Sequence, residues 1–126
     1  MADLRTMEPL TLVLGASPDP SRYSYLAVQR LVGKGQPVLA VGKRSGNIGV
    51  VEIKPDVPEG TQVHTVTLYL APGNQRLWED RLLALHPSRV IFNPGTENDA
   101  FAVRLREAGI EVVEACTLVM LATGDY

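Results

Sequence analysis

The stretch Leu10-Thr11-Leu12-Val13-Leu14-Gly15-Ala16-Ser17 decides how this chain folds. It is a short apolar run that stops at a glycine, and a helix-like pattern follows from Tyr23. Such a run is typical of a buried parallel strand that leads into a phosphate-binding turn. Gly15 allows a tight turn, and the small Ala16 and Ser17 let an anion approach the backbone. Many α/β proteins without a nucleotide also need a glycine here, so the turn alone leaves ligand binding open.

Length and composition indicate one globular domain. The 126 residues are 45% hydrophobic and 21% charged, and the formal net charge is −2. We therefore expect no general attraction to nucleic acid or to acidic membranes. Cys116 is the only cysteine, which excludes an internal disulfide and a thiolate zinc cage. With no recognisable signal peptide or membrane span, we expect a cytoplasmic protein with a flexible lead-in over residues 1–9 and one domain over residues 10–126.

Positive charge is concentrated in residues 20–51. This segment contains none of the 14 acidic residues of the chain and five of its 12 basic ones, which are Arg22, Arg30, Lys34, Lys43 and Arg44. A basic segment within an acidic protein predicts an anionic ligand nearby. A chance cluster of solvated side chains is the alternative.

Hydrophobic periodicity predicts the other elements. Further strands are expected over residues 37–41, 63–70, 89–92 and 110–113, with an edge strand or an extended excursion over residues 48–53. Helices are expected over residues 23–32, 74–85, about 98–108 and within 116–121. Ser21 and Asn74 are the predicted caps of the first two helices. The second helix is expected to bury Leu77, Trp78, Leu82 and Leu85.

Alternating strands and helices predict a Rossmann-like, doubly wound α/β fold. We expect a five-stranded parallel sheet in the order 3-2-1-4-5, between two layers of helices, with a switch point between the first and fourth strands. Ligands of such sheets bind at the carboxyl ends of the strands beside the switch point. The loops at those ends are predicted at residues 15–17, 42–44, 70–72, 93–95 and 114–116, on one rim.

The residues after the first two strands discriminate between nucleotide cofactors. In the dinucleotide fingerprint that begins at Gly15, Ser17 and Pro20 replace the second and third glycines. Lys43 and Arg44 stand where an acidic residue would bind a free ribose 2′-hydroxyl, which disfavours NAD. Two basic side chains suit a phosphorylated ribose, as in NADP or coenzyme A.

The sequence resembles the small, single-domain coenzyme A-binding proteins, whose fold is similar to the nucleotide-binding domain of the succinyl-coenzyme A synthetase α subunit. The resemblance covers residues 10–126 and rests on the blocks 15–18, 41–44, 66–70, 89–98 and 114–119. It implies that Ser17 and its neighbours contact the phosphates and that Lys43 or Arg44 contacts the phosphoadenosine. Residues 70–72 and 93–95 would follow the pantetheine arm. The synthetase domain that bears the phosphorylated histidine has no counterpart here, so synthetase activity is not implied.

The predicted ligand contacts combine these arguments. They are Gly15, Ala16, Ser17, Arg22, Tyr23, Gly42, Lys43, Arg44, Leu70, Ala71, Pro72, Asn93, Pro94, Gly95 and Cys116. Asn93 either contacts the ligand or only holds the turn at residues 94–95. Cys116 is either a packing residue or a thiol near the pantetheine end that exchanges with a coenzyme A disulfide.

No catalytic or metal-binding constellation is visible at the predicted rim. His64 and His86 lie away from it, and Glu97 and Glu114 lack the spacing of an acid and base pair. We therefore expect that the protein is not an enzyme. We expect it to bind coenzyme A or an acyl-coenzyme A and to act as a carrier, sensor or regulatory module. An NADP-dependent oxidoreductase and an interaction module without a ligand are the alternatives. We expect a monomer or homodimer; the acyl group, the protein partner and the pathway stay open.

Overall fold

The run quoted above forms β1 (Thr11–Leu14), the central strand of a seven-stranded sheet. The computed structural model describes residues 9–126, so most of the predicted lead-in lies outside the described residues. The other strands are β2 (Val38–Val41), β3 (Gly46–Ile48), β4 (Val51–Lys54), β5 (Thr65–Leu68), β6 (Arg89–Phe92) and β7 (Glu111–Glu114). The helices are α1 (Tyr23–Gly33), α2 (Pro72–Leu85), α3 (Asp99–Glu107) and α4 (Thr117–Thr123).

The sheet has the order β3-β4-β2-β1-β5-β6-β7, and only β3 pairs antiparallel with its neighbour. The α/β class is confirmed, but the prediction of five strands in the order 3-2-1-4-5 is wrong. Among the five predicted strands the observed order is 2-1-3-4-5, because β5 pairs with β1 rather than with β2. The switch point therefore lies between β1 and β5.

The hairpin β3–β4 explains this order. Residues 48–53 were expected to form one edge strand or excursion, but Gly49 has φ +60° and reverses the chain between two strands. β4 pairs in parallel with the outer edge of β2. Because β4 occupies that edge, β5 pairs with the free edge of β1 instead.

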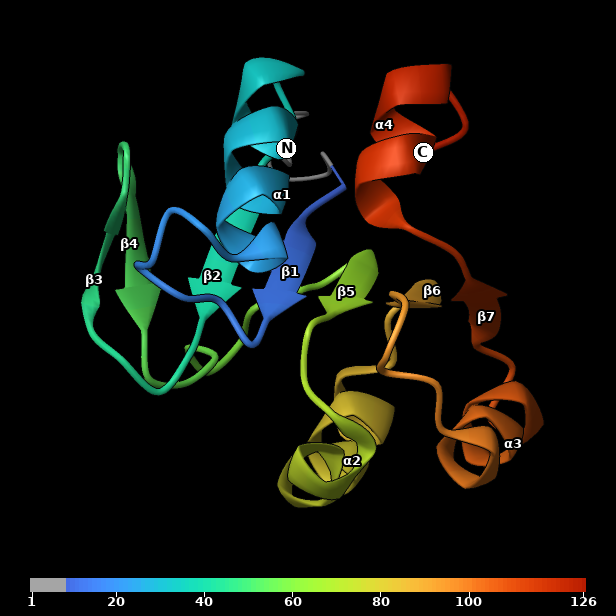
Figure 1. Cartoon of the computed structure of the whole chain (residues 1–126). Helices are drawn as coiled ribbons and strands as arrows, with labels where there is room; N and C mark the ends of the chain where they lie inside the picture. The colour runs from blue at the N-terminus through green and yellow to red at the C-terminus, as the bar shows by residue number, and fades with distance from the viewer. Residues whose placement is uncertain (1–8) are drawn as a thin grey trace, which may run out of the picture.

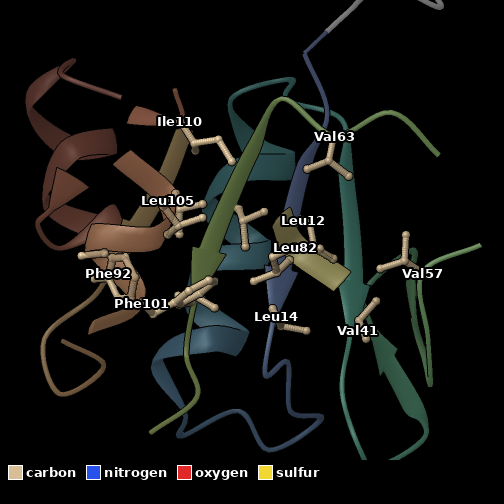
Figure 2. Packing of buried hydrophobic residues seen from close by; sticks show 14 residues of the cluster. Leu12, Leu14, Val41, Val57, Val63, Leu82, Phe92, Phe101, Leu105 and Ile110 are labelled. Carbon is tan, nitrogen blue, oxygen red and sulfur yellow. The ribbon is translucent and has the colours of Figure 1, made fainter. Parts of the chain in front are cut away.

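Two helices cover each face of the sheet: α1 and α4 lie on one face, α2 and α3 on the other (Figure 1). The faces follow the alternation of side chains along β1. Leu12 and Leu14 belong to the cluster that also contains Leu82, Phe101 and Leu105 (Figure 2). Val13 belongs to the opposite cluster, with residues of α1 and α4. The carboxyl ends of the parallel strands are left uncovered by this packing.

The helix starts differ from the predicted caps. α1 begins at Tyr23 as expected, but its N-cap is Arg22 rather than Ser21. α2 begins at Pro72, so Asn74 lies inside its first turn instead of capping it. Proline suits the first helical position because no backbone donor is needed there. Within residues 9–126, no helix is long and apolar enough to cross a membrane.

His64 and His86 lie at the amino ends of β5 and β6, opposite the predicted rim at the carboxyl ends of the strands. His64 directly precedes β5, and its Nδ1 lies 2.8 Å from the Thr65 Oγ1. His86 ends α2 with φ +49°, and its Nε2 lies 3.0 Å from the Ala108 carbonyl oxygen. Both side chains are exposed. They are therefore placed too far from the strands' carboxyl ends to act there.

Candidate ligand-binding site

Four adjoining hollows form a trough along the carboxyl ends of β1, β2, β5 and β6. We name them, in order, the outer hollow (about 130 Å³), the basic hollow (about 170 Å³), the central hollow (about 350 Å³) and the inner chamber (about 260 Å³). The outer and basic hollows share Lys43, and the basic and central hollows share Arg44. Tyr23, Tyr69 and Pro94 line both the central hollow and the inner chamber.

All but one of the predicted ligand contacts line this trough. The exception is Pro72, which occupies the first position of α2. The structure adds residues that the sequence did not single out as contacts: Leu14, Ser24, Val41, Pro55, Tyr69, Gly73, Asn74, Leu77, Trp78, Thr96 and Leu118. Many of them come from the residue after β5 and from the first half of α2. If β5 had been predicted as the neighbour of β1, the sequence would have indicated that this segment lines the trough.

The turn after β1 is hydrogen-bonded to the end of the neighbouring strand β2. The amides of Gly15 and Ala16 both donate to the Val41 carbonyl oxygen at 2.9 Å. The Ser17 Oγ accepts a hydrogen bond from the Asp19 amide at 3.1 Å, which leaves the hydroxyl proton to donate. An anion in the trough must therefore find most of its donors beyond Gly15 and Ala16.

The first turn of α1 supplies such donors. Its N-cap Arg22 makes no side-chain capping hydrogen bond, and both Tyr23 and Ser24 line the central hollow. Backbone amides at a helix N-terminus lack intrahelical partners and attract anions. Ser17, Arg22 and Arg44 line the same hollow, so a hydroxyl and two guanidinium groups surround it. The central hollow therefore has the chemistry of an anion site.

One carboxylate stands near these cations. The Ser21 amide and hydroxyl donate to the Asp19 Oδ1 at 3.0 and 2.8 Å. These hydrogen bonds lower the pKa of Asp19, with smaller contributions from Arg22 and Arg44. Asp19 therefore stays ionised at neutral pH and partly offsets the positive charge.

Two glycines allow the turn after β1 to contact the segments that follow β2 and β5. A Cβ on Gly42 would lie 2.0 Å from the Ala16 carbonyl oxygen. A Cβ on Gly15, which has φ +96°, would lie 2.9 Å from the Tyr69 carbonyl group. These close approaches place the loop with Lys43 against the turn after β1.

The outer hollow is an apolar shelf beside a lysine. Leu77 is 88% exposed, although the helical pattern predicted it to be buried. It lines the hollow together with Lys43, Pro55 and Trp78. The Arg81 guanidinium lies 5.5 Å from the centre of the Trp78 ring on the same helix. Leu77 is exposed because it lies near the start of α2 and faces the trough instead of the hydrophobic core.

Asn93 ties β5 to α4. Its Nδ2 donates to the Thr67 Oγ1 at 2.7 Å and to the Leu68 carbonyl oxygen at 2.8 Å. Its Oδ1 accepts from the Thr117 amide at 2.8 Å. The side chain is only 3% exposed. The Asn93 carbonyl oxygen also accepts from the Thr96 amide and hydroxyl, so its backbone holds the turn at residues 94–95.

The inner chamber ends the trough. Cys116, the N-cap of α4, is half-buried there and lies beside Leu118. The Tyr69 hydroxyl is buried without a hydrogen-bond partner among residues 9–126. Burial raises the pKa of Tyr69 to about 12, so it stays protonated at neutral pH. Within the same residues, no three His, Cys, Asp or Glu side chains gather to hold a metal ion.

Comparisons with known proteins identify the family of this chain and solved structures that share its fold. The sequence profile of the CoA binding domain matches residues 10–122. A crystal structure of an uncharacterized protein is 45% identical, with a TM-score of 0.90, and the match covers 94% of this chain and 98% of that one. The Thermus thermophilus protein cell-free ID.343 is 25% identical, with a TM-score of 0.81 over 98% of this chain and 96% of that one.

A larger protein contains a similar fold. The acetyl-coenzyme A synthetase 1 of Ca. Korarchaeum cryptofilum is 17% identical, with a TM-score of 0.70. The match covers 91% of this chain but 28% of the synthetase, so it shows a shared fold alone. No curated protein matches this sequence.

Proposed function

Because this chain belongs to the CoA binding domain family, as its resemblance to small coenzyme A-binding proteins predicted, we propose that it binds coenzyme A in the trough. The observation that carries the proposal is the order of chemistry along the trough. An apolar shelf beside Lys43 leads to an anion site and then to an uncharged chamber. Coenzyme A has the same order: a base with a phosphorylated ribose, a diphosphate, and a neutral arm that ends in a thiol.

This order suggests a placement for each part of the ligand. The adenine would lie on Leu77 and Trp78, with Lys43 near the ribose phosphate. The diphosphate would lie in the central hollow, at the first turn of α1 and Arg44. The pantetheine arm would then pass Pro94 toward the inner chamber.

We propose a carrier, sensor or regulatory role rather than catalysis by this chain. Glu97 is the carboxylate that follows the loop at residues 93–95, and its Oε1 accepts a hydrogen bond from the Gly95 amide at 2.7 Å. It therefore holds the loop instead of standing free as a base. The trough is lined by cations, hydroxyls and apolar groups, which suit binding better than proton transfer.

Calorimetry with four ligands tests the identity of the cofactor. We expect coenzyme A to bind at least about tenfold more tightly than dephospho-coenzyme A, because a lost hydrogen bond between charged groups costs about 1.5–3 kcal/mol. NAD and NADP should bind more weakly still, since neither has an arm that fills the inner chamber. NADP binding as tight as that of coenzyme A would instead support the oxidoreductase alternative.

The basic pair at the end of β2 gives a second prediction. Replacing both Lys43 and Arg44 with alanine should weaken coenzyme A binding by about 1–3 kcal/mol, measured by calorimetry at low salt. Both side chains are exposed, so the urea midpoint should hardly change. The matched control replaces Arg30 and Lys34, which carry the same charge at the far end of α1. An equal loss of affinity in the control would show that net charge alone matters.

A further inference from the structure

The inner chamber is lined by uncharged groups. Its six lining residues are Tyr23, Tyr69, Asn93, Pro94, Cys116 and Leu118, and none of them is an Asp, Glu, Lys, Arg or His. The nearest cations of the trough, Arg22 and Arg44, line the central hollow instead. A charged group in the chamber would therefore give up water without gaining an oppositely charged side chain.

Of the polar side chains in the lining, Asn93 and Tyr69 have their polar atoms engaged or hidden, and Tyr23, which is 72% exposed, keeps a free hydroxyl at the mouth. Both donors of Asn93 Nδ2 are used by Thr67 and Leu68, and its Oδ1 accepts from the Thr117 amide. The Tyr69 hydroxyl is fully buried, so the residue presents its ring to the chamber. What remains at the surface is two aromatic rings, the Tyr23 hydroxyl, a proline, a leucine and one thiol, which together favour an apolar occupant.

The size of the chamber limits that occupant. An apolar cavity of about 150 Å³ is enough to hold benzene. The inner chamber has about 260 Å³ and must also receive the sulfur end of the pantetheine arm. It therefore suits a chain of roughly four to six carbons, by the same scale.

We propose that the inner chamber binds an uncharged, short acyl group carried on the thiol of coenzyme A. The ligand is then a short-chain acyl-coenzyme A, and neither a dicarboxylic nor a long-chain one. This inference rests on the proposed function, because the chamber is reached from the central hollow past Tyr23, Tyr69 and Pro94.

Calorimetry on the full chain, with free, acetyl-, butyryl-, succinyl- and lauroyl-coenzyme A, tests the inference. Butyryl- should bind about fifteenfold more tightly than acetyl-coenzyme A, since it has two more methylenes and each buried methylene contributes about fourfold. Succinyl-coenzyme A has the same number of acyl carbons and a carboxylate, and should bind at least about tenfold more weakly than the butyryl form. Equal affinity of those two, or affinity that keeps rising to the lauroyl form, would overturn the inference.

Two variants locate the effect. Leu118→Trp narrows the chamber, so butyryl-coenzyme A should lose more affinity than free coenzyme A, and the ratio of the two affinities should fall to about one. Val119→Trp adds the same ring at a neighbouring position that is 57% exposed, and should keep the parental ratio. A Leu118→Trp variant that binds free coenzyme A and keeps the parental ratio would contradict the inference.

Cys116 serves as a reporter because it is the only thiol in the chain. Butyryl-coenzyme A should slow its reaction with a small thiol reagent more than coenzyme A does at equal saturation. Unchanged labelling under tight butyryl-coenzyme A binding would place the acyl group elsewhere. If free coenzyme A itself does not bind, the proposed function fails; if it binds and the acyl forms gain nothing, only this inference fails.

Discussion

Replacing Gly42 with alanine is expected to destabilise the protein by more than about 3 kcal/mol and to abolish ligand binding. The new Cβ would lie 2.0 Å from the carbonyl oxygen of Ala16 and 3.0 Å from its carbonyl carbon. Both are backbone atoms that cannot rotate away, so the loops after β1 and β2 must separate. Overpacking in a well-packed interior costs about 1–3 kcal/mol or more, and a clash with backbone lies at the upper end.

The free energy of unfolding in urea and coenzyme A calorimetry measure this effect. Gly33→Ala is the matched control, because nothing lies within 4 Å of the added Cβ and its backbone is helical. It should change stability by less than about 1 kcal/mol. A Gly42→Ala protein as stable as the parent would mean that the two loops are not in contact in solution.

Replacing Asn93 with alanine is expected to cost about 3–5 kcal/mol. The Thr117 amide and the Leu68 carbonyl oxygen lose their side-chain partners, and each buried unsatisfied group costs about 1–3 kcal/mol. A small cavity adds to the loss. Because Asn93 holds the start of α4, amide exchange at Thr117 should accelerate more than exchange in β1.

Asn47→Ala is the control for this substitution. Asn47 is exposed on the edge strand β3, and its loss should change stability by less than about 0.5 kcal/mol. Urea denaturation and hydrogen exchange monitor both variants. A cost below about 1 kcal/mol for Asn93→Ala would show that water replaces the lost hydrogen bonds.

Local pattern was sufficient for much of the fold and for the place of the candidate site. The apolar run of β1 with Gly15, the alternation of strands and helices, and the loops after the strands are all short-range features. They predict an α/β protein with its candidate residues on one rim, and the trough lies there. Lys43 and Arg44 could be placed at this rim because only Gly42 separates them from the end of a strand that its own residues determine; their role in ligand binding stays a prediction.

Strand order could not be read from local pattern. The segment with β5 is equally suited to either edge of the growing sheet, because pairing depends on which edge is free. The hairpin of residues 46–54 occupies the edge of β2, and only its tertiary pairing makes β5 the neighbour of β1. For the same reason the contribution of Leu77 and Trp78 to the trough was missed, since α2 follows β5.

The sequence by itself determined most of the strands and helices, the rim where the strands end and the basic residues placed there, because these features depend on residues close together in the chain. It did not determine the N-caps of α1 and α2 or the hairpin β3–β4. Tertiary structure alone decided which polar groups are free. The amides of Gly15 and Ala16 are bound by Val41, and the side chain of Asn93 bonds groups 24–26 residues away in sequence. Hydrogen bonds of that range follow from the packing of whole elements, so they appear only once strands and helices are placed side by side.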